Sequence, residues 1–394
     1  MLIAALMTSP GEYDPGMARF VAALTAVAVL TLAPHATAAT ADRQLDAQMK
    51  KLVTMKGGPP GAISVVQRDG QRAVHRAGVA NLRDRTPMRS TDRMRIASMS
   101  KAFSGAVALS LVQKGVLSVD DTIAKWLPSL PAAWSQVTLR QLLDHTSGLP
   151  DYTKDQPLLA AVARHPHRLF LPHATLLTYV ADEPLNFTPG SQYLYSNSDN
   201  IAVALMAEAA TGRTYDDLLA SEVYTPAGLT QTSMPDGWRI PAPYIHGYDL
   251  TESPPPDIST ALAMSFVWAS GGLLSTPDDV TSFIRAYAGR KLFNQAVQDQ
   301  QLQLVDGHSE PIGPGVNRAG MGIFQYSTRC GVVYGHTGNF PGYTQFMGAT
   351  LGGTRSATFA INMQLDSAKL SRTQRPVFAA LRKAEETAVC AALS

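Results

Sequence analysis

Strand-like segments stand near both ends of this 394-residue chain, and mostly helical segments lie between and after them. The strand-like segments are residues 62–67 and 73–80 near one end, and residues 331–334, 343–351 and 356–363 near the other. Asp69-Gly70 separates the first two and is a strong signal for a two-residue hairpin turn. Residues 376–393 have the amphipathic pattern of a closing helix. The pattern predicts an α+β fold: one antiparallel sheet of five or more strands, flanked by helices, that the chain leaves and re-enters.

The same pattern divides the chain into two domains. Residues 42–117 and 261–394 would build the sheet domain, and residues 118–260 would form an inserted, mostly helical domain. The proline-rich loop at 253–257 marks the boundary. A composition of 45% hydrophobic and 16% charged residues suffices for a large core and does not fit a disordered chain.

The N-terminal segment has the pattern of an export signal. Arg19 precedes an apolar stretch over residues 20–32, and the Ala-x-Ala endings that follow predict cleavage after Ala38 or Ala41. The apolar stretch is short for a transmembrane helix, although an uncleaved membrane anchor stays an alternative. We therefore expect residues 1–41 to be a signal peptide and the mature protein to be secreted without a membrane span.

The start of the chain and its net charge carry two further expectations. Met17 directly precedes Ala18-Arg19, so translation could begin there and residues 1–16 could lie outside the natural protein. The formal net charge is only +2 at pH 7, which argues against a nucleic acid as partner. We expect a monomer that acts on a small molecule.

Ser98 stands three residues before Lys101, at the front of a mostly apolar run from Ala102 to Leu117. On a helix these two positions share a face, so the hydroxyl and the amine can touch. A serine hydroxyl becomes a good nucleophile only when a base removes its proton, and burial lowers the pKa of a lysine toward that role. The free N–H groups of a helix N-terminus could stabilise the oxygen of an attacked carbonyl. Taken alone, a Ser-x-x-Lys pattern also arises by coincidence.

Tyr195-Ser196-Asn197 follows a Pro189-Gly190 turn and is the second candidate motif. On an extended segment, Tyr195 and Asn197 project to the same side. A cationic lysine nearby would lower the pKa of the tyrosine, which could then relay a proton. The Asn197 amide could accept from the lysine and donate to a substrate carbonyl. A tyrosine that simply packs in the helical domain is the alternative.

His336-Thr337-Gly338-Asn339 follows one of the C-terminal strands and is the third candidate motif. Gly338 would let a substrate backbone lie close to the strand. The N–H of Asn339 could pair with that of Ser98 as an oxyanion hole. A lone histidine is more often structural, so His336 gains its meaning from the other two motifs.

The two cysteines, Cys330 and Cys390, fit no zinc-binding spacing, and no His-Glu-x-x-His occurs, so we expect neither a metal nor another cofactor. In an exported protein the pair can form a disulfide, and two buried free thiols are the alternative. We favour the bond because Cys330 opens a predicted strand and Cys390 lies on the predicted last helix.

Together, the three motifs in this order resemble the penicillin-recognising serine hydrolases: DD-peptidases, class C β-lactamases and related esterases. The resemblance extends from about Asp42 to Ser394, and His336 with the two cysteines is most similar to secreted actinomycete D-alanyl-D-alanine carboxypeptidases. It implies that Ser98 is the nucleophile, Lys101 its base, Tyr195 the proton relay to the leaving amine, and His336 a link between this network and the strand. It also implies that Thr337 and Trp268 line the substrate cleft.

Three features bear on this interpretation. Ser198-Asp199-Asn200 also matches the Ser-Asp-Asn of class A β-lactamases, which we interpret as coincidence because the rest matches the tyrosine branch. The carboxypeptidases carry an arginine for the substrate carboxylate on the strand before the cysteine, but residues 320–326 contain none, and Arg329 is out of register. We expect His145 to be structural, holding the loop before Gly148.

The motifs predict a secreted serine hydrolase that forms an acyl-enzyme. The resemblance implies that the substrate is a D-Ala-D-Ala peptide of the peptidoglycan type, with β-lactams as acylating inhibitors. The missing arginine keeps an esterase, a D-amino-acid peptidase and a class C-like β-lactamase open as alternatives. A non-catalytic binding or sensor protein is less consistent with the motifs, because binding alone needs no buried amine beside a hydroxyl.

Overall fold

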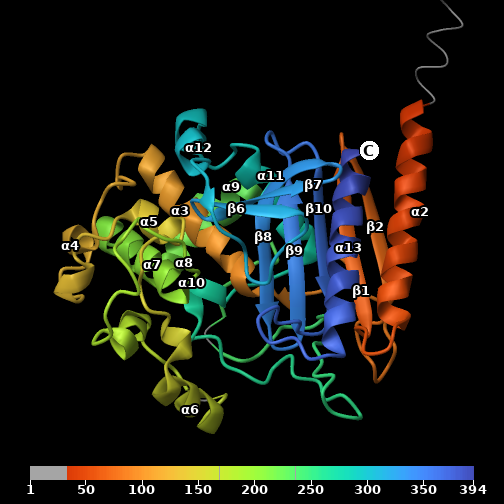
Figure 1. Cartoon of the computed structure of the whole chain (residues 1–394), viewed down its shortest axis with the longest axis horizontal. Coiled ribbons are helices and arrows are strands. Elements are labelled where there is room, and N and C mark those ends of the chain that lie inside the picture. Colours follow the sequence, from red (N-terminus) through yellow and green to blue (C-terminus); the bar gives the residue numbers. More distant parts are fainter. Residues whose placement is uncertain (1–32, 168, 236) are drawn as a thin grey trace, which may run out of the picture.

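An eight-stranded antiparallel sheet forms the centre of the protein, as the computed structural model shows for residues 33–394 except 168 and 236 (Figure 1). The strand order is β2-β1-β10-β9-β8-β7-β6-β5. The strands are β1 (Gly61–Arg68), β2 (Gln71–Gly78), β5 (Val305–Asp306), β6 (Val316–Gly320), β7 (Ile323–Thr328), β8 (Gly331–Phe340), β9 (Tyr343–Ala349) and β10 (Ser356–Ile361), and a separate pair consists of β3 (Met94–Arg95) and β4 (Leu274–Ser275). The predicted α+β fold is confirmed.

The predicted hairpin and the three predicted C-terminal strands are present. Asp69 and Gly70 join β1 to β2, and both have a positive φ, which is the backbone conformation of tight hairpin turns. β8, β9 and β10 follow one another in the sheet as predicted, but β8 continues to Phe340 and so includes the whole His-Thr-Gly-Asn motif. The sequence analysis did not resolve β5, β6 and β7, which extend the sheet beyond β8.

Helices cover both faces of the sheet. α13 (Gln374–Leu393) packs on β1 and β10, and α2 (Ala33–Thr54) lies against α13 and β2 (Figure 1). α11 (Pro277–Ala288) packs on the opposite face, against β1, β9 and β10. The Thr276 side chain caps α11 by accepting from the N–H of Asp279 at 3.1 Å, and Pro277 opens the helix.

The remaining helices gather beside the sheet, to the left of β8 in the view of Figure 1. The α-helices of this part are α3 (Ser100–Gln113), α4 (Ile123–Trp126), α5 (Leu139–Leu143), α6 (Gln156–Arg164), α7 (Asn197–Thr211), α8 (Tyr215–Leu218), α9 (Thr225–Ala227), α10 (Trp268–Gly271) and α12 (Gln295–Gln301). The short helices of other types are η1 (Ala97–Met99), η2 (Ala132–Trp134), η3 (Tyr152–Lys154), η4 (His173–Val180) and η5 (Leu219–Tyr224). Gly212 ends α7 in the left-handed conformation, as expected for a helix stop.

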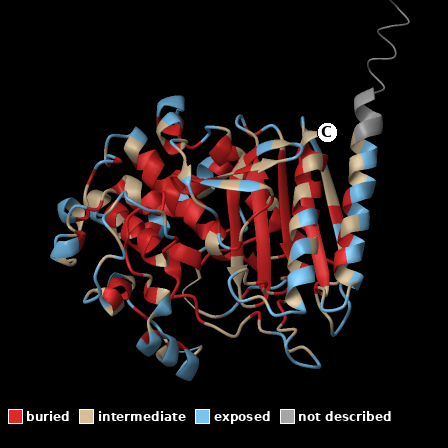
Figure 2. Ribbon diagram, viewed as in Figure 1, coloured by how far each residue is buried: buried red, intermediate tan, exposed pale blue. Residues whose placement is uncertain are grey.

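The sheet separates two apolar cores. One core lies under α2 and α13 and includes Leu45 and Leu381, and the larger one joins α3, α7 and α11. Buried residues accordingly follow the central strands and α3, whereas the outer side of α2 is exposed (Figure 2). α3 is buried along nearly its whole length, which explains the mostly apolar sequence after Lys101.

The N-terminal predictions lie partly outside the described residues. The signal peptide prediction covers residues 1–41, of which the structure describes only the last part, within α2. The helix that contains these last residues, α2, begins at Ala33 and continues past Asp42 to Thr54. Among the described residues, no helix is both long and apolar enough to cross a lipid bilayer.

A disulfide joins Cys330 to Cys390, with 5.2 Å between the two Cα atoms. It ties the turn between β7 and β8 to the last turns of α13, which are the positions that favoured a bond in the sequence analysis. The described part of the chain contains no free cysteine.

Candidate active site

Ser98 lies in η1, directly before α3 begins at Ser100. The sequence predicted both Ser98 and Lys101 on one helix, but a short turn of different type carries the serine. Ala97 precedes it with φ at 51°, a left-handed conformation that costs a non-glycine residue about 1–3 kcal/mol. Such strain persists where the surrounding structure fixes the backbone, and here it sets the direction of the half-buried Ser98.

Lys101 is 1% exposed, and its Nζ contacts three oxygen atoms. Nζ lies 3.2 Å from Ser98 Oγ, 2.7 Å from Asn197 Oδ1 and 2.7 Å from the carbonyl oxygen of Ser270 in α10. The Asn197 and Ser270 oxygens can only accept hydrogen bonds. A neutral Lys101 amine therefore donates its two hydrogens to them, which directs its lone pair at the Ser98 hydroxyl.

Burial lowers the pKa of Lys101 to about 7. The charges of Asp151, Glu310 and Asp199 oppose this effect without overcoming it. Near neutral pH, about half of the molecules hold a free amine, whereas an ordinary lysine would be almost entirely protonated. Lys101 thus has the ionisation that a general base requires.

Tyr195 borders the same group, with its ring centroid 4.9 Å from Lys101 Nζ. Its hydroxyl is buried and makes no hydrogen bond of standard geometry with the described residues. The expectation that a cationic lysine lowers the pKa of Tyr195 is wrong. Burial raises this pKa well above 10, and the proximity of Ser98 opposes the rise only in part. Tyr195 therefore remains a phenol, which can donate a proton but does not hold a standing negative charge.

Asn197 begins α7 and connects Lys101 to the loop before η3. Its Nδ2 donates to Asp151 Oδ2 at 3.1 Å and to Thr153 Oγ1 at 3.0 Å. These bonds fix which end of the amide faces Lys101. They also occupy the donor that the sequence analysis assigned to a substrate carbonyl.

His336 and Thr337 lie in β8, both 1% exposed. Burial lowers the pKa of His336 to about 3, so the ring is neutral at physiological pH. His336 Nδ1 donates to the Thr337 carbonyl oxygen at 2.6 Å, which leaves Nε2 as an acceptor. The ring centroids of His336 and Tyr195 are 6.4 Å apart. Thr337 Oγ1 donates to the carbonyl oxygen of Pro311 at 2.8 Å, so its hydroxyl holds a neighbouring loop.

Gly338 holds β8 against the segment that carries the nucleophile. A Cβ at this position would lie 2.5 Å from the carbonyl oxygen of Ile96 and 2.6 Å from Gln345 Oε1. The space that the sequence analysis reserved for a substrate backbone is thus filled by the protein itself. This contact brings the edge of β8 to η1, where the Ser98 N–H finds no acceptor among the described residues.

The edge of β8 beside Gly338 has no strand partner, because β7 pairs with β8 only as far as Gly335. Asn339 lies in this unpaired stretch, and its Oδ1 accepts from Thr344 Oγ1 at 3.2 Å. The two N–H groups expected to form an oxyanion hole, those of Ser98 and Asn339, therefore belong to segments in direct contact.

Trp268 begins α10 and packs in the interior. Its indole is 2% exposed, stacks on the His173 ring at 4.2 Å and meets the Tyr215 ring edge-on at 5.1 Å. The side chain therefore lies among the core residues, and a contact between Trp268 and a substrate stays a prediction. α10 contributes to the site through the Ser270 carbonyl oxygen instead.

Ser198, Asp199 and Asn200 turn away from Lys101 and form internal hydrogen bonds in the first turn of α7. Their partners are Pro150, Ser147 with His145, and Ser104. The interpretation of this Ser-Asp-Asn sequence as coincidence agrees with the structure, because Asn197 is the asparagine that contacts the lysine.

His145 contacts Asp199 and Tyr195 and holds the segment that carries Tyr195. Its Nδ1 lies 2.7 Å from Asp199 Oδ2, and its ring centroid lies 4.5 Å from that of Tyr195. Its carbonyl oxygen accepts from the N–H of Leu194, next to Tyr195. Burial lowers the pKa of His145 to about 3. These contacts agree with the structural role that we expected.

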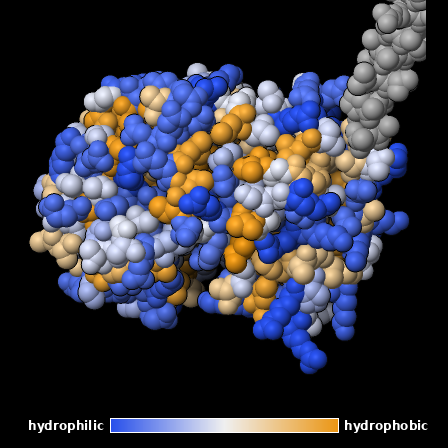
Figure 3. Space-filling model, turned by 45° about the horizontal axis from the view of Figure 1, so that its top comes forward, coloured by the Kyte–Doolittle hydropathy of each residue, from blue (hydrophilic) through white to orange (hydrophobic). Residues whose placement is uncertain are grey.

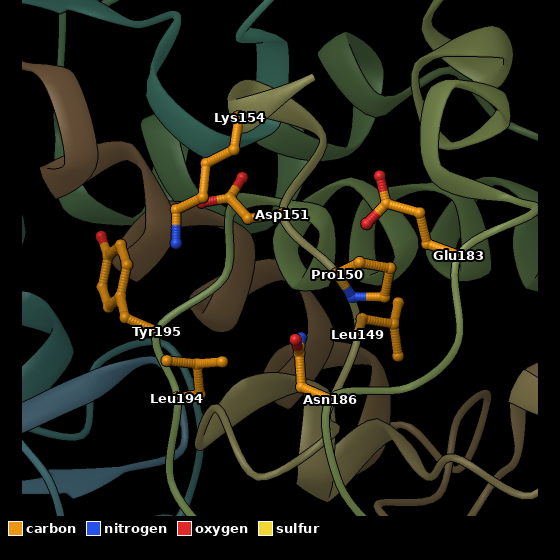
Figure 4. A pocket seen from close by; sticks show the side chains of 8 residues that line it. All are labelled: Leu149, Pro150, Asp151, Lys154, Glu183, Asn186, Leu194 and Tyr195. Carbon is orange, nitrogen blue, oxygen red and sulfur yellow. The ribbon is translucent and has the colours of Figure 1, made fainter. Parts of the chain in front are cut away.

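A cavity of about 250 Å³ adjoins Tyr195. Its walls consist of Leu149, Pro150, Asp151, Lys154, Glu183, Asn186, Leu194 and Tyr195. Tyr195 and Glu183 lie at opposite ends, and the Lys154 amine is on the Tyr195 side (Figure 4). Asp151, Lys154 and the Ser270 carbonyl were not predicted from the sequence, although Asp151 stands only three residues after Gly148, which the sequence analysis named.

No arginine lines this cavity. Arg329, the out-of-register arginine considered in the sequence analysis, pairs with Glu386 at 3.3 Å beside the disulfide. The only cation among the lining residues is Lys154. In the part of the chain that the structure describes, no group of three or more His, Cys, Asp or Glu side chains is arranged to hold a metal ion.

Comparison with known proteins identifies the family. Residues 37–375 match the beta-lactamase family. The chain belongs to the beta-lactamase family. Its members are serine hydrolases, and the family predicted from the three motifs is confirmed.

Penicillin-binding protein 4* of Bacillus subtilis strain 168 is 26% identical over 289 residues, which cover 69% of this chain and 61% of that protein. A D-aminopeptidase of Cereibacter sphaeroides strain KD131 is 34% identical over 209 residues, which cover 53% and 38%. The chain thus spans less than two thirds of these curated relatives.

Solved structures share the fold. A D-stereospecific amidohydrolase from Streptomyces sp. has a TM-score of 0.71 and 26% identity, with 82% of this chain and 94% of that chain covered. The D-amino acid amidase from Ochrobactrum anthropi SV3, complexed with L-phenylalanine amide, has a TM-score of 0.77 and 22% identity, with 88% and 98% covered. The octameric penicillin-binding protein homologue from Pyrococcus abyssi has a TM-score of 0.67 and 19% identity, with 82% and 74% covered. The last two show the fold alone, and the monomeric state of this chain stays a prediction.

Proposed function

We propose that this protein hydrolyses amide bonds through a covalent acyl-enzyme on Ser98. The neutral Lys101 amine accepts the hydroxyl proton while Ser98 Oγ attacks the substrate carbonyl carbon. The observation that carries the proposal is the 3.2 Å contact between Lys101 Nζ and Ser98 Oγ, in a geometry that aims the amine lone pair at the hydroxyl. The Lys101 pKa of about 7 supports the same step.

The attacked carbonyl oxygen becomes negative, and the N–H groups of Ser98 and Asn339 stabilise it. When the carbon–nitrogen bond breaks, the leaving nitrogen takes a proton from the Tyr195 phenol, which recovers one from Lys101. A water molecule then attacks the ester on Ser98 and gives its proton to the Lys101 amine, the base of the first step. The acid product leaves, and the Ser98 hydroxyl is restored. His336, neutral and bonded to its own strand, holds β8 in place beside Tyr195.

The substrates that we propose are amides and short peptides whose acyl side is a D-amino acid. Two observations favour this class: curated and solved relatives are named D-aminopeptidase and D-stereospecific amidohydrolase, and the cavity has no arginine for a substrate carboxylate. D-Ala-D-Ala carboxypeptidase activity is the second candidate. The similarity to penicillin-binding protein 4* and the position of Lys154 in the cavity wall support it.

The first experiment compares hydrolysis of D-phenylalanine amide, L-phenylalanine amide and a D-Ala-D-Ala peptide by the purified protein. We expect the D-amide to be cleaved much faster than its enantiomer and faster than the peptide. Ser98→Ala should abolish all turnover while circular dichroism shows an unchanged fold. Residual turnover by the folded Ser98→Ala protein would place the nucleophile elsewhere.

The second experiment tests the acyl-enzyme itself. Incubation with a fluorescent penicillin, followed by digestion and mass spectrometry, should give an adduct on the peptide that contains Ser98. An active enzyme that never yields this adduct would contradict the prediction that β-lactams acylate it. The Lys101→Met variant is the matched control, because it keeps the serine but loses the base.

We further propose that the protein is secreted after cleavage near Ala38 or Ala41. The apolar stretch and small residues of the N-terminal sequence support this, and the disulfide fits an oxidising compartment. N-terminal sequencing of protein recovered from culture medium should begin at Ala39 or Asp42. Recovery only in the cytoplasm, with the N-terminus intact, would refute it.

A further inference from the structure

The contacts of the Asn197 amide form a closed ring of hydrogen bonds with two residues of the loop before η3 and of η3 itself. Asn197 Nδ2 donates one hydrogen to Asp151 Oδ2 at 3.1 Å and the other to Thr153 Oγ1 at 3.0 Å. The Thr153 hydroxyl donates its single hydrogen to Asp151 Oδ1 at 2.8 Å, so its oxygen accepts from Asn197. Asp151 is the member of this ring that accepts at both oxygens and donates nothing.

This carboxylate determines which way the Asn197 amide is turned. The two ends of an amide side chain have nearly the same shape, but one end donates and the other accepts. If Asn197 turned over, its Oδ1 would face Asp151 Oδ2, and two acceptors would meet with no hydrogen between them. The observed orientation avoids this repulsion and places Asn197 Oδ1 at 2.7 Å from Lys101 Nζ.

The orientation of the amide decides what the neutral Lys101 amine does with its lone pair. Asn197 Oδ1 and the Ser270 carbonyl oxygen accept the two amine hydrogens, so the lone pair points at Ser98 Oγ, 3.2 Å away. A turned amide would instead donate to Lys101, and a neutral amine accepts only through its lone pair. The base would then be occupied, and Ser98 would keep its proton.

Asp151 is held in place by its own segment of the chain. Its side chain also accepts from the N–H of Thr153 at 3.1 Å, a bond of an aspartate to the backbone two residues on that begins η3. Asp151 and Tyr195 both line the cavity of about 250 Å³ (Figure 4). Asp151 therefore reaches the base from the cavity side, through Asn197, and makes no direct hydrogen bond to Lys101.

We propose that Asp151 is a positioning residue, which keeps the Lys101 lone pair directed at Ser98 by fixing the orientation of the Asn197 amide. This inference rests on the proposed function, because it takes Lys101 as the base of the acylation step. It assigns the carboxylate in the cavity wall to the base and not to a substrate group.

Removal of the Asp151 charge then has two effects of opposite sign. It lets the Asn197 amide turn over, which lowers the rate of acylation at every pH. It also removes a charge that raises the pKa of Lys101, so the neutral amine forms at lower pH. The other titratable groups around Lys101 are the carboxylates of Glu310 and Asp199, the phenol of Tyr195 and the neutral imidazoles of His145 and His336.

The test is the pH profile of kcat/KM for hydrolysis of D-phenylalanine amide. Asp151→Asn keeps the shape of the side chain, and asparagine begins a helix as well as aspartate does. We expect the plateau of kcat/KM to fall by about 10- to 100-fold, the range of a lost charged hydrogen bond, while the acidic limb moves to lower pH. Thr153→Val removes the uncharged partner of Asn197, so it should lower the plateau less and leave the limb in place.

Exchange of the two groups provides a rescue. In the double variant Asp151→Asn, Asn197→Asp, the carboxylate at position 197 presents an oxygen to Lys101 in either orientation. The plateau should rise at least about tenfold above that of Asp151→Asn, and the new charge beside Lys101 should move the limb to higher pH. Asp182→Asn is the charge control, because this exposed carboxylate lies outside the cavity wall and should affect neither quantity.

Circular dichroism should show the wild-type fold in every variant. An unchanged plateau in folded Asp151→Asn would overturn the proposal, as would a plateau that falls without movement of the limb, which is the signature of a merely structural role. A folded double variant that recovers no activity at any pH would also overturn it. Wild-type enzyme that neither cleaves D-phenylalanine amide nor reacts with the fluorescent penicillin would instead refute the proposed function.

Discussion

Glu385 gives the stability of this protein a calculable dependence on pH. The residue lies on α13, against the sheet, and is 3% exposed. Burial raises its pKa to about 8, and the only charge that opposes the rise is that of Arg382. Arg382 directs its guanidinium to the carbonyl oxygens of Gly313 and Gly315, at 2.8 and 3.0 Å, so it forms no ion pair with Glu385.

The magnitude follows from the two pKa values. The folded protein keeps the Glu385 proton up to about pH 8, whereas the unfolded chain releases it near 4.5, the ordinary pKa of a glutamate side chain. Below pH 4.5 both states are protonated and the residue has no effect. Between these values the free energy of unfolding falls as the pH rises, by about 3 kcal/mol at pH 7 and about 5 kcal/mol above pH 9.

Glu385→Gln replaces the carboxyl by a neutral group of the same shape and should remove this dependence. We expect the variant to match the wild type at pH 4 and to be more stable by about 3 kcal/mol at pH 7. Urea unfolding followed by circular dichroism, with the disulfide intact, measures the difference through the midpoint at constant slope. Glu386→Gln is the control, because this neighbour forms a partly exposed pair with Arg329 that contributes at most about 1 kcal/mol. A gain of the same size at both pH values, or none at pH 7, would refute the reasoning.

Three further outcomes follow from the site and the disulfide. The pH profile of kcat/KM should rise toward alkaline pH through a limb near pH 7, because the Lys101 amine must be neutral to act; a limb above pH 9 in stopped-flow assays would contradict this. Gly338→Ala should reduce kcat/KM by at least about 100-fold, since its Cβ would push Ile96 and the nucleophile away; an unchanged kcat/KM in a folded variant would exclude this contact as a determinant. Replacing both Cys330 and Cys390 by serine should lower the free energy of unfolding by about 4 kcal/mol, the loop-entropy value for their separation of 60 residues; denaturant midpoints equal to those of wild type would refute it.

Local sequence patterns predicted the parts of the site that are close in sequence. Ser98 and Lys101 are three residues apart, and Tyr195 and Asn197 are two apart, so helix and strand periodicity suffices to place each pair on one side. The strands that surround the third motif were predicted for the same reason. By contrast, β5 and β6 are too short or too polar to show a clear alternating pattern.

The rest of the site depends on contacts between distant segments. The Ser270 carbonyl that accepts from Lys101 is a backbone group, which every residue type has, so the sequence does not indicate its role. The charge of Glu310 acts on Lys101 across more than two hundred residues of sequence. The sign of the Tyr195 pKa change also required the structure, because the sequence cannot weigh burial against a neighbouring amine whose own pKa has fallen.

The pairing of β1 with β10 joins Ala62 to Ile361. These two neighbouring strands are therefore synthesised at very different times. A ribosome that adds about 5–20 residues per second needs roughly 15–60 seconds between them. During that interval the nascent hairpin exposes an unsatisfied row of peptide groups to any passing extended polypeptide. Only the synthesis of β10, within the last hundred residues of the chain, supplies the strand that pairs with this edge of β1.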